Sequence, residues 1–137
     1  MASNFKPKLT FIDFEFATYN PRGFDIADHF AKYACDYSVK NPPYTDLAKL
    51  ASKEEMIQFM LAYVEEFYPN LHNEEEKMEE AENLLQETMA FLPISPFFWG
   101  GYMINHVLNH PSTFDAFGLA LERFGIYFSQ KHLLEEL

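Results

Sequence analysis

A single strand-like run near the start of the chain constrains the fold more than any other feature. Residues 8–14 are apolar, β-branched and aromatic, which is typical of a buried strand. One strand cannot pair its own backbone groups, and the rest of the sequence offers no second persuasive strand. We therefore expect a mainly α protein, α+β only through this strand, whose partner strands come from beyond the 137 residues.

The remainder of the chain predicts about five helices, separated by turns rich in proline, glycine and asparagine. Ser52 and Glu55 form a capping-box pattern, Asn73 suits the cap of an acidic helix, and Ser112 suits the cap of the last helix. Prolines 93 and 96 are expected to end or kink the acidic helix. The predicted helices span residues 24–37, 52–67, 73–91, 97–109 and 114–133.

Length and composition favour one domain over residues 1–137. A chain of this length buries roughly two-thirds of its unfolded surface, so it needs neither a disulfide nor a structural metal. Hydrophobic residues make up 48% and charged residues 23%, which argues against disorder. Aromatic residues reach 18%, so either the core is very aromatic or some rings line a pocket or a partner surface.

The charge and the cysteine count exclude several classes of function. The net charge of −11 repels nucleic acid and anionic lipid, so no nucleic-acid partner is expected. The longest apolar stretch, 89–104, is shorter than the ~20 residues of a membrane-spanning helix, so no membrane insertion is expected. The single Cys35 fits a reducing compartment, and we expect a cytoplasmic protein.

Two acids at the end of the predicted strand are candidate metal ligands. Carboxylates at strand ends lie where open α/β folds bind ligands, and Mg²⁺ prefers oxygen ligands. Asp13 and Glu15 are two residues apart, so in a continuing strand they would share a face. Taken alone, this pair is weak evidence for a metal site, and an acid in a turn at the end of a strand is the more frequent explanation.

The segment that follows resembles the signature of a known family. Residues 12–30 read Ile-Asp-Phe-Glu-Phe-Ala-Thr-Tyr-Asn-Pro-Arg-Gly-Phe-Asp-Ile-Ala-Asp-His-Phe. Choline/ethanolamine kinases carry Ile-Asp-Phe-Glu-Tyr, two small residues and Tyr-Asn-x-Arg-Gly-Phe-Asp-Ile-Gly-Asn-His-Phe. Residues 98–102 resemble the family's Trp-Gly-Leu-Trp, and parts of 114–131 resemble its last helix. The resemblance spans about residues 9–131.

The resemblance implies the C-terminal lobe of a protein-kinase-like enzyme. In such enzymes Mg²⁺ and ATP deliver a phosphoryl group to choline or ethanolamine in phospholipid biosynthesis. Asp13 matches the catalytic, metal-binding acid, and Glu15 matches a Glu that assists it. Asp25 matches a structural acid, which at a helix start would also accept backbone N–H groups, and Arg22 is grouped with it as structural.

The resemblance also implies a substrate pocket of aromatic residues. A quaternary ammonium cannot donate an N–H hydrogen bond, so ring faces bind it through cation–π attraction. Without the family pattern, such rings would more often belong to the core. The matching pocket residues are Tyr37, Trp99, Tyr102 and Phe114.

Departures from the family pattern leave two functions open. Lys32 stands where the family has a Glu that holds the positive end of the substrate. Leu119 replaces a Tyr of the aromatic pocket and Tyr102 replaces a Trp, so the pocket is expected to bind a cation more weakly. The ATP lobe with its lysine and the catalytic loop would precede residue 1, so a missing N-terminal half or a homodimer partner is expected. The chain is therefore either part of a kinase, inactive alone, or a catalytically dead binding module.

Overall fold

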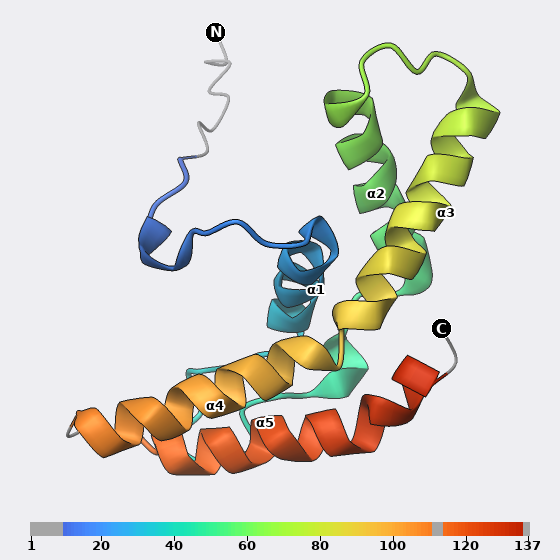
Figure 1. Cartoon of the computed structure of the whole chain (residues 1–137). Coiled ribbons are helices and arrows are strands. Elements are labelled where there is room, and N and C mark those ends of the chain that lie inside the picture. Colours follow the sequence, from blue (N-terminus) through green and yellow to red (C-terminus); the bar gives the residue numbers. More distant parts are fainter. Residues whose placement is uncertain (1–9, 111–113, 136–137) are drawn as a thin grey trace, which may run out of the picture.

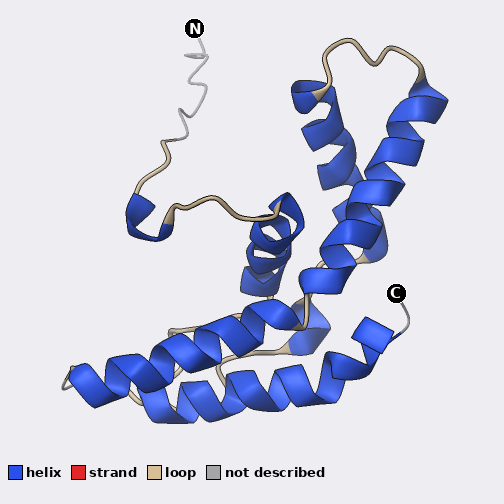
Figure 2. Cartoon of the chain, viewed as in Figure 1, coloured by secondary structure: helices blue, strands red, loops and turns tan. Residues whose placement is uncertain are grey.

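The computed structural model describes residues 10–110 and 114–135, and these are mainly helical, as predicted. They form five α-helices and three short 3-10 helices (Figure 2). The α-helices are α1 (Arg22–Tyr33), α2 (Lys53–Phe67), α3 (Glu74–Phe91), α4 (Ile94–Asn109) and α5 (Ala116–Gln130). The 3-10 helices are η1 (Phe14–Phe16), η2 (Leu47–Lys49) and η3 (Lys131–Glu135). No described helix is long and apolar enough to cross a membrane.

The α-helices are arranged as two antiparallel hairpins with α1 beside their junction (Figure 1). Helices α2 and α3 form the first hairpin and α4 and α5 the second, and the two hairpins run roughly across one another. Helix α1 packs against α3 and also contacts α4. This position lets one short helix contribute side chains to both hairpins.

The main core lies between α1, α2 and α3. Phe30 of α1, Met60 and Val64 of α2, and Leu84 of α3 are buried in it. Met60 and Val64 are four residues apart, which places them on one face of α2. Apolar burial on these faces is the main stabilising contribution to a helical unit of this size.

The predicted N-terminal strand is not found in the described residues. Residues 10–13 have no regular secondary structure, residues 14–16 form η1, and residues 8–9 lie outside the described part. Every side chain from 10 to 20 is exposed, including Phe11 at 84%. The prediction was wrong here because apolar composition alone does not form a strand: the run has no neighbour to pair its backbone groups.

The helix ends follow local capping chemistry, and some predicted bounds shift. The capping box of Ser52 with Glu55 is confirmed, and Asn73 caps α3 by accepting from the amide of Glu75 at 2.9 Å. Helix α4 begins three residues earlier than predicted, because a proline in a first turn loses no helical hydrogen bond.

The first and last helices are shorter than predicted. Helix α1 starts at Arg22 but ends at Tyr33, since the chain then turns and the amide of Asp46 donates to the carbonyl of Ala34 at 2.8 Å. Helix α5 is capped by Asp115, which accepts from the amide of Gly118, and it gives way to η3 after Gln130. The predicted cap Ser112 lies outside the described residues.

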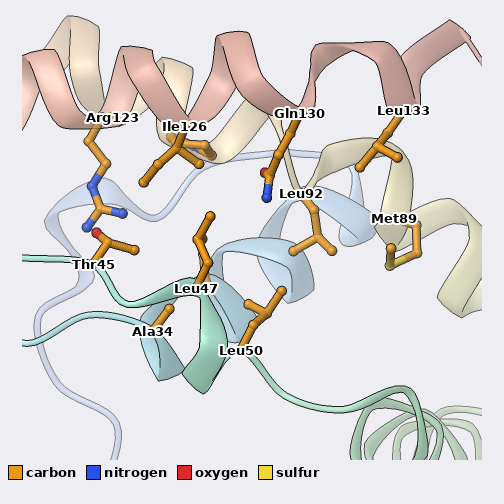
Figure 3. A pocket seen from close by; sticks show the side chains of 12 residues that line it. Ala34, Thr45, Leu47, Leu50, Met89, Leu92, Arg123, Ile126, Gln130 and Leu133 are labelled. Atoms are coloured by element: carbon orange, nitrogen blue, oxygen red, sulfur yellow. The ribbon is translucent and has the colours of Figure 1, made fainter.

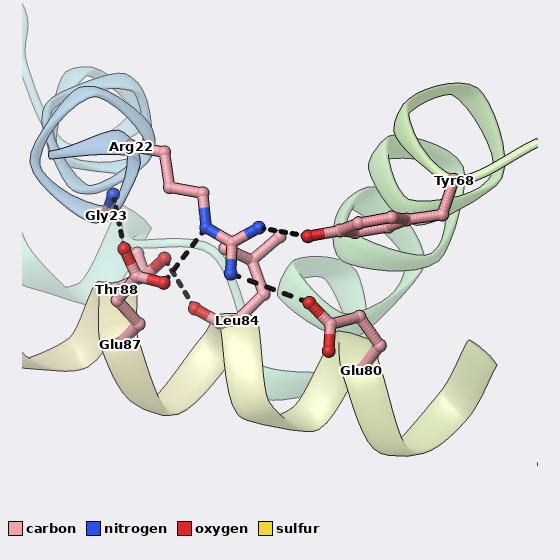
Figure 4. A network of polar contacts seen from close by, with 7 residues as sticks. All are labelled: Arg22, Gly23, Tyr68, Glu80, Leu84, Glu87 and Thr88. Atoms are coloured by element: carbon pink, nitrogen blue, oxygen red, sulfur yellow. Dashed lines mark hydrogen bonds and ion pairs between the residues drawn. The ribbon is translucent and has the colours of Figure 1, made fainter. Parts of the chain in front are cut away.

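A polar network fixes the start of α1 to the first hairpin (Figure 4). Arg22 donates through Nε to Glu87 Oε2 at 3.0 Å and through Nη1 to the hydroxyl of Tyr68 at 2.9 Å, and Nη2 lies 3.5 Å from Glu80 Oε1. The amide of Gly23 donates to the other Glu87 oxygen at 3.3 Å. The guanidinium of Arg22 therefore joins α1 to α3 and to Tyr68, the residue that follows α2.

Helix α1 lies very close to α3 at Gly23. A Cβ atom built there would lie 2.9 Å from the Phe91 ring and 3.1 Å from the backbone oxygen of Glu87. Real Cβ atoms essentially never come within 3.0 Å of another heavy atom, so a larger residue would push the helices apart. Glycine at this position lets the Arg22 network form at short range.

Replacing Arg22 by Ala should lower the free energy of unfolding by about 1–3 kcal/mol, the range for lost hydrogen bonds to charged groups. The matched control is Lys49→Ala, because the Lys49 side chain is 61% exposed and its ion pair with Asp46 is long, at 3.8 Å. The control should change stability by less than about 1 kcal/mol. Urea unfolding of both variants measures the difference, and equal losses would show that the network is not structural.

Candidate functional site

The signature segment and the first half of α4 together enclose a cavity of about 810 Å³. We call it the acidic cavity, because three carboxylates line it with one arginine. It brings residues 15–28 against residues about seventy positions later in the chain. The lining residues are Glu15, Phe16, Ala17, Thr18, Asn20, Arg22, Phe24, Asp25, Asp28, Phe98 and Trp99.

Three aromatic rings meet at the edge of this cavity. Trp99 and Tyr102, one turn apart on α4, lie 5.5 Å from each other between ring centroids. Phe16 of η1 packs edge-on against both, at 5.5 Å and 5.3 Å. We call these three residues the aromatic cluster. The sequence interpretation did not name Phe16 as a site residue, although it stands at the Tyr of the family signature, and that correspondence was the available signal.

The orientation of Trp99 is set by a carboxylate of α1. Asp28 Oδ1 accepts a hydrogen bond from the indole Nε1 of Trp99 at 2.7 Å and another from the hydroxyl of Ser95 at 2.6 Å. Both donors belong to α4, so Asp28 also joins α1 to the second hairpin. Because this hydrogen bond uses the edge of the indole, it leaves the ring face free to contact a cation.

That ring face is occupied by a lysine of the same chain. The ammonium of Lys32 lies 4.6 Å from the centroid of the Trp99 ring and 3.6 Å from Asp28 Oδ1. Asp28 and Lys32 are four residues apart on α1, the spacing at which helical side chains meet. The aromatic cluster therefore holds a cation that the chain itself provides.

The two other predicted pocket aromatics lie in different surroundings. Tyr37, which falls beyond the end of α1, accepts a hydrogen bond from Arg123 Nη2 at 3.0 Å. Burial raises the pKa of Tyr37, and the neighbouring charge of Arg123 partly opposes that shift. The ring of Phe114 lies 5.2 Å from that of Tyr44. The part of the chain that the structure describes thus has no ring contact between Tyr37 and the aromatic cluster.

The candidate metal ligands Asp13 and Glu15 are both exposed. Asp13 has φ 67°, the only non-glycine residue with positive φ among those described, and it directly precedes η1. The chain does not continue as a strand, so the expectation of a shared strand face for the two acids is wrong. Neither carboxylate has a described hydrogen bond or ion pair, and no cluster of three His, Cys, Asp or Glu occurs in the described ranges.

Asp25 lies in the first turn of α1 and lines the acidic cavity with its side chain exposed. The residue preceding the helix is Pro21, whose side chain has no polar atom with which to cap it. No described backbone amide donates to Asp25, so the expected capping contact is absent from the described residues. The positive end of the helix dipole still favours a carboxylate at this place.

The chain is thus a mainly α protein built from two helical hairpins, and its aromatic cluster holds the Lys32 ammonium over the Trp99 ring. The family model for choline/ethanolamine kinase matches residues 1–128. That match covers most of the 137 residues. The chain belongs to the choline/ethanolamine kinase family.

Individual relatives give the same assignment. The chain is 36% identical to choline kinase A2 of Caenorhabditis elegans over 133 residues, which cover 96% of this chain and 30% of that protein. It is 33% identical to choline kinase alpha of Mus musculus, covering 93% and 29%. It is 34% identical to a probable ethanolamine kinase of Arabidopsis thaliana, covering 97% and 33%. The chain thus spans no more than 33% of the length of these relatives.

Replacing Asp28 by Ala should destabilise the protein by about 1–3 kcal/mol, because two donors of α4 then lose their acceptor. Asp28→Asn is the matched control, since an amide oxygen can still accept from both Ser95 and Trp99. We expect the Asn variant to lose less than half as much. Trp99 is the only tryptophan, so its fluorescence reports unfolding directly. Equal losses in both variants would contradict the role of Asp28 as acceptor.

Proposed function

We propose that this chain is the substrate-binding part of an amino-alcohol kinase. Residues 1–137 would act as one domain, in a reducing compartment such as the cytoplasm. In the enzyme that contains it, the hydroxyl oxygen of choline or ethanolamine attacks the γ-phosphorus of ATP, ADP leaves and the hydroxyl proton is lost. The observation that carries this proposal is the cation held over Trp99 within the aromatic cluster.

The aromatic cluster has the chemistry that a quaternary ammonium requires. Ring faces attract a cation through their quadrupole by about 0.5–2 kcal/mol each, without any N–H donor on the ligand. The present position of Lys32 Nζ, 4.6 Å from the ring centroid, marks where a ligand cation would sit. Asp28 adds a fixed negative charge next to that position. A ligand with a positive end and a hydroxyl fits this arrangement.

Asp13 and Glu15 would hold Mg²⁺ in the complete enzyme. Mg²⁺ is usually bound by one or two carboxylates, with substrate phosphates and waters completing the shell. Two exposed carboxylates with free oxygens meet that requirement. When bound there, Mg²⁺ supplies neutralisation of charge on the nucleotide phosphates. The two acids would hold the ion, and the phosphates of ATP and waters would complete its shell.

A second function is favoured by one specific contact. Because the ammonium of Lys32 fills the cation position, the chain can be a binding module that has lost the kinase substrate. A substrate cation would then have to displace the Lys32 ammonium, which is held both by the ring and by its ion pair with Asp28. The choice between the two functions therefore depends on whether choline binds, and on what residue 32 contributes.

Replacing Lys32 by Glu should create measurable choline binding where the native chain binds weakly or not at all. Removing an ammonium from the ring face frees the site, and at about 4–6 Å a like charge opposes a ligand cation by roughly 3–4 kcal/mol at an effective dielectric constant near 20. Titration with choline, followed by Trp99 fluorescence and by calorimetry, measures the affinity. Lys32→Met should give an intermediate gain.

The control for charge alone is Lys53→Glu, which makes the same change of charge at the start of α2 and outside the acidic cavity. It should leave choline affinity unchanged. If the Lys32 variants bind choline no better than the native chain, the cation site is not a substrate site and the binding-module function stands. If Lys53→Glu raises the choline affinity as much as Lys32→Glu does, the gain results only from the change of net charge.

Replacing Asp13 by Ala should reduce kinase turnover by orders of magnitude, because one of the two carboxylates proposed to hold Mg²⁺ is removed. The assay uses choline kinase A2 with its matched 133 residues exchanged for this chain. The control, Asp36→Ala, removes an exposed carboxylate that accepts hydrogen bonds from Ser38 of the same turn. An unchanged turnover in the Asp13 variant would make Asp13 a turn residue without a metal role.

A further inference from the structure

A second cavity lies beneath α5, on the side where η2 and the end of α1 approach that helix (Figure 3). Its volume is about 100 Å³, and it shares no lining residue with the acidic cavity. Most of its wall is apolar and comes from four different segments. The apolar lining includes Ala34, Leu47, Leu50, Leu92, Ile126 and Leu133.

One end of this cavity carries a buried positive charge without a carboxylate partner. Arg123 is only 4% exposed, and its Nη2 donates to Cys35 Sγ and to the Tyr37 hydroxyl, both at 3.0 Å. None of the ion pairs between described residues includes Arg123. A guanidinium stays protonated when buried, and buried charges are normally paired because their desolvation is costly. The cavity therefore offers a buried cation that has no carboxylate partner among the described residues.

Two further polar groups lie along the same cavity. Among the residues that the structure describes, the Thr45 hydroxyl is buried without a hydrogen-bond partner, and Thr45 lines the cavity together with Arg123 (Figure 3). The side-chain amide of Gln130 points into the cavity from α5 (Figure 3). An unpaired buried hydroxyl is costly, so a ligand that accepts from it gains what the free protein lacks. The opposite end, near Leu133, is apolar.

We propose that this cavity binds a short-chain monocarboxylate, with its carboxylate on Arg123 and Thr45 and its alkyl tail on the apolar wall. A planar guanidinium matches carboxylate geometry, and the Thr45 hydroxyl adds a donor. An apolar cavity of about 150 Å³ holds a ligand the size of benzene, with six non-hydrogen atoms, so a cavity of about 100 Å³ encloses about four. Propionate and butyrate exceed that number by one and two atoms, so the end of their alkyl tail would lie at the apolar end of the cavity near Leu133. The inference does not depend on the proposed kinase function.

Other kinds of ligand fit the cavity less well. An alkylammonium would be repelled by Arg123, and an alcohol or hydrocarbon would leave the guanidinium uncompensated. Phosphate brings more charge than one guanidinium balances, and it would leave the apolar wall uncovered. A carboxylate with a short tail satisfies both ends of the cavity together. This combination of charge and length defines the ligand class.

The test is an NMR titration of the whole, isotopically labelled chain with sodium butyrate. We expect saturable shifts of the backbone amides of Thr45, Leu47 and Ile126. Sodium chloride, n-butanol and butylammonium chloride are the reference ligands, and each should bind at least about tenfold more weakly, the factor expected for the loss of one charge-assisted contact. A separate titration with choline keeps the outcome distinct from that of the proposed function.

Two variants test the polar end of the cavity. Arg123→Met should abolish butyrate binding, but this buried change also removes structural contacts. Thr45→Val is nearly isosteric and removes a hydroxyl without a partner, so it should keep the fold and weaken butyrate binding about tenfold. Lys49→Met, an exposed charge outside the cavity, should leave the affinity unchanged.

Three results would overturn the proposal. The first is the absence of saturable shifts with butyrate at these amides. The second is equal binding of n-butanol, which would make the cavity a site for any small apolar ligand. The third is an unchanged butyrate affinity in the folded Thr45→Val variant, which would place the carboxylate elsewhere.

Discussion

The structure depends on the polar side chains by which α1 is bonded to both hairpins. Arg22, at its start, bonds to Glu87 of α3 and to Tyr68 after α2. Asp28, two turns later, accepts from Ser95 and Trp99 of α4. Apolar packing between helices is weakly directional, whereas these bonds require particular atoms to meet. They therefore fix where α4, and with it the aromatic cluster, lies relative to the signature segment.

The same helix geometry that positions Trp99 also places a competing cation on it. Residues four apart on a helix face the same way, so a lysine at position 32 meets both Asp28 and the ring that Asp28 orients. The side chain is 42% exposed, so its charge is partly hydrated and its ion pair is weak. The ring face is thus occupied by a contact that a better-bound cation could displace.

The sequence predicted the helical elements well because their signals are local. Capping at Ser52 and Asn73 depends on neighbours within three residues, and both caps formed as expected. The strand over 8–14 was wrong in its described part because a strand depends on a pairing partner, which no local pattern reveals. For the site, the spacing of Trp99 and Tyr102 on one helix face was predictable. The contacts of Lys32 with Trp99 and of Arg123 with Tyr37 join distant segments, and only the fold brings them together.

The residue at position 32 affects both groups that would bind a ligand cation, the ring faces of the aromatic cluster and the carboxylate of Asp28. With Lys32 present, the charge of Asp28 is already partly neutralised, so the site offers an incoming ammonium the ring faces and a weakened negative charge. A carboxylate at position 32 would instead stand one turn from Asp28, where two like charges repel each other. Binding a cation between them would relieve that repulsion, so the gain in affinity would exceed the removal of the lysine alone. A single residue on α1 thereby decides whether the aromatic cluster is filled by the protein's own side chain or available to a substrate.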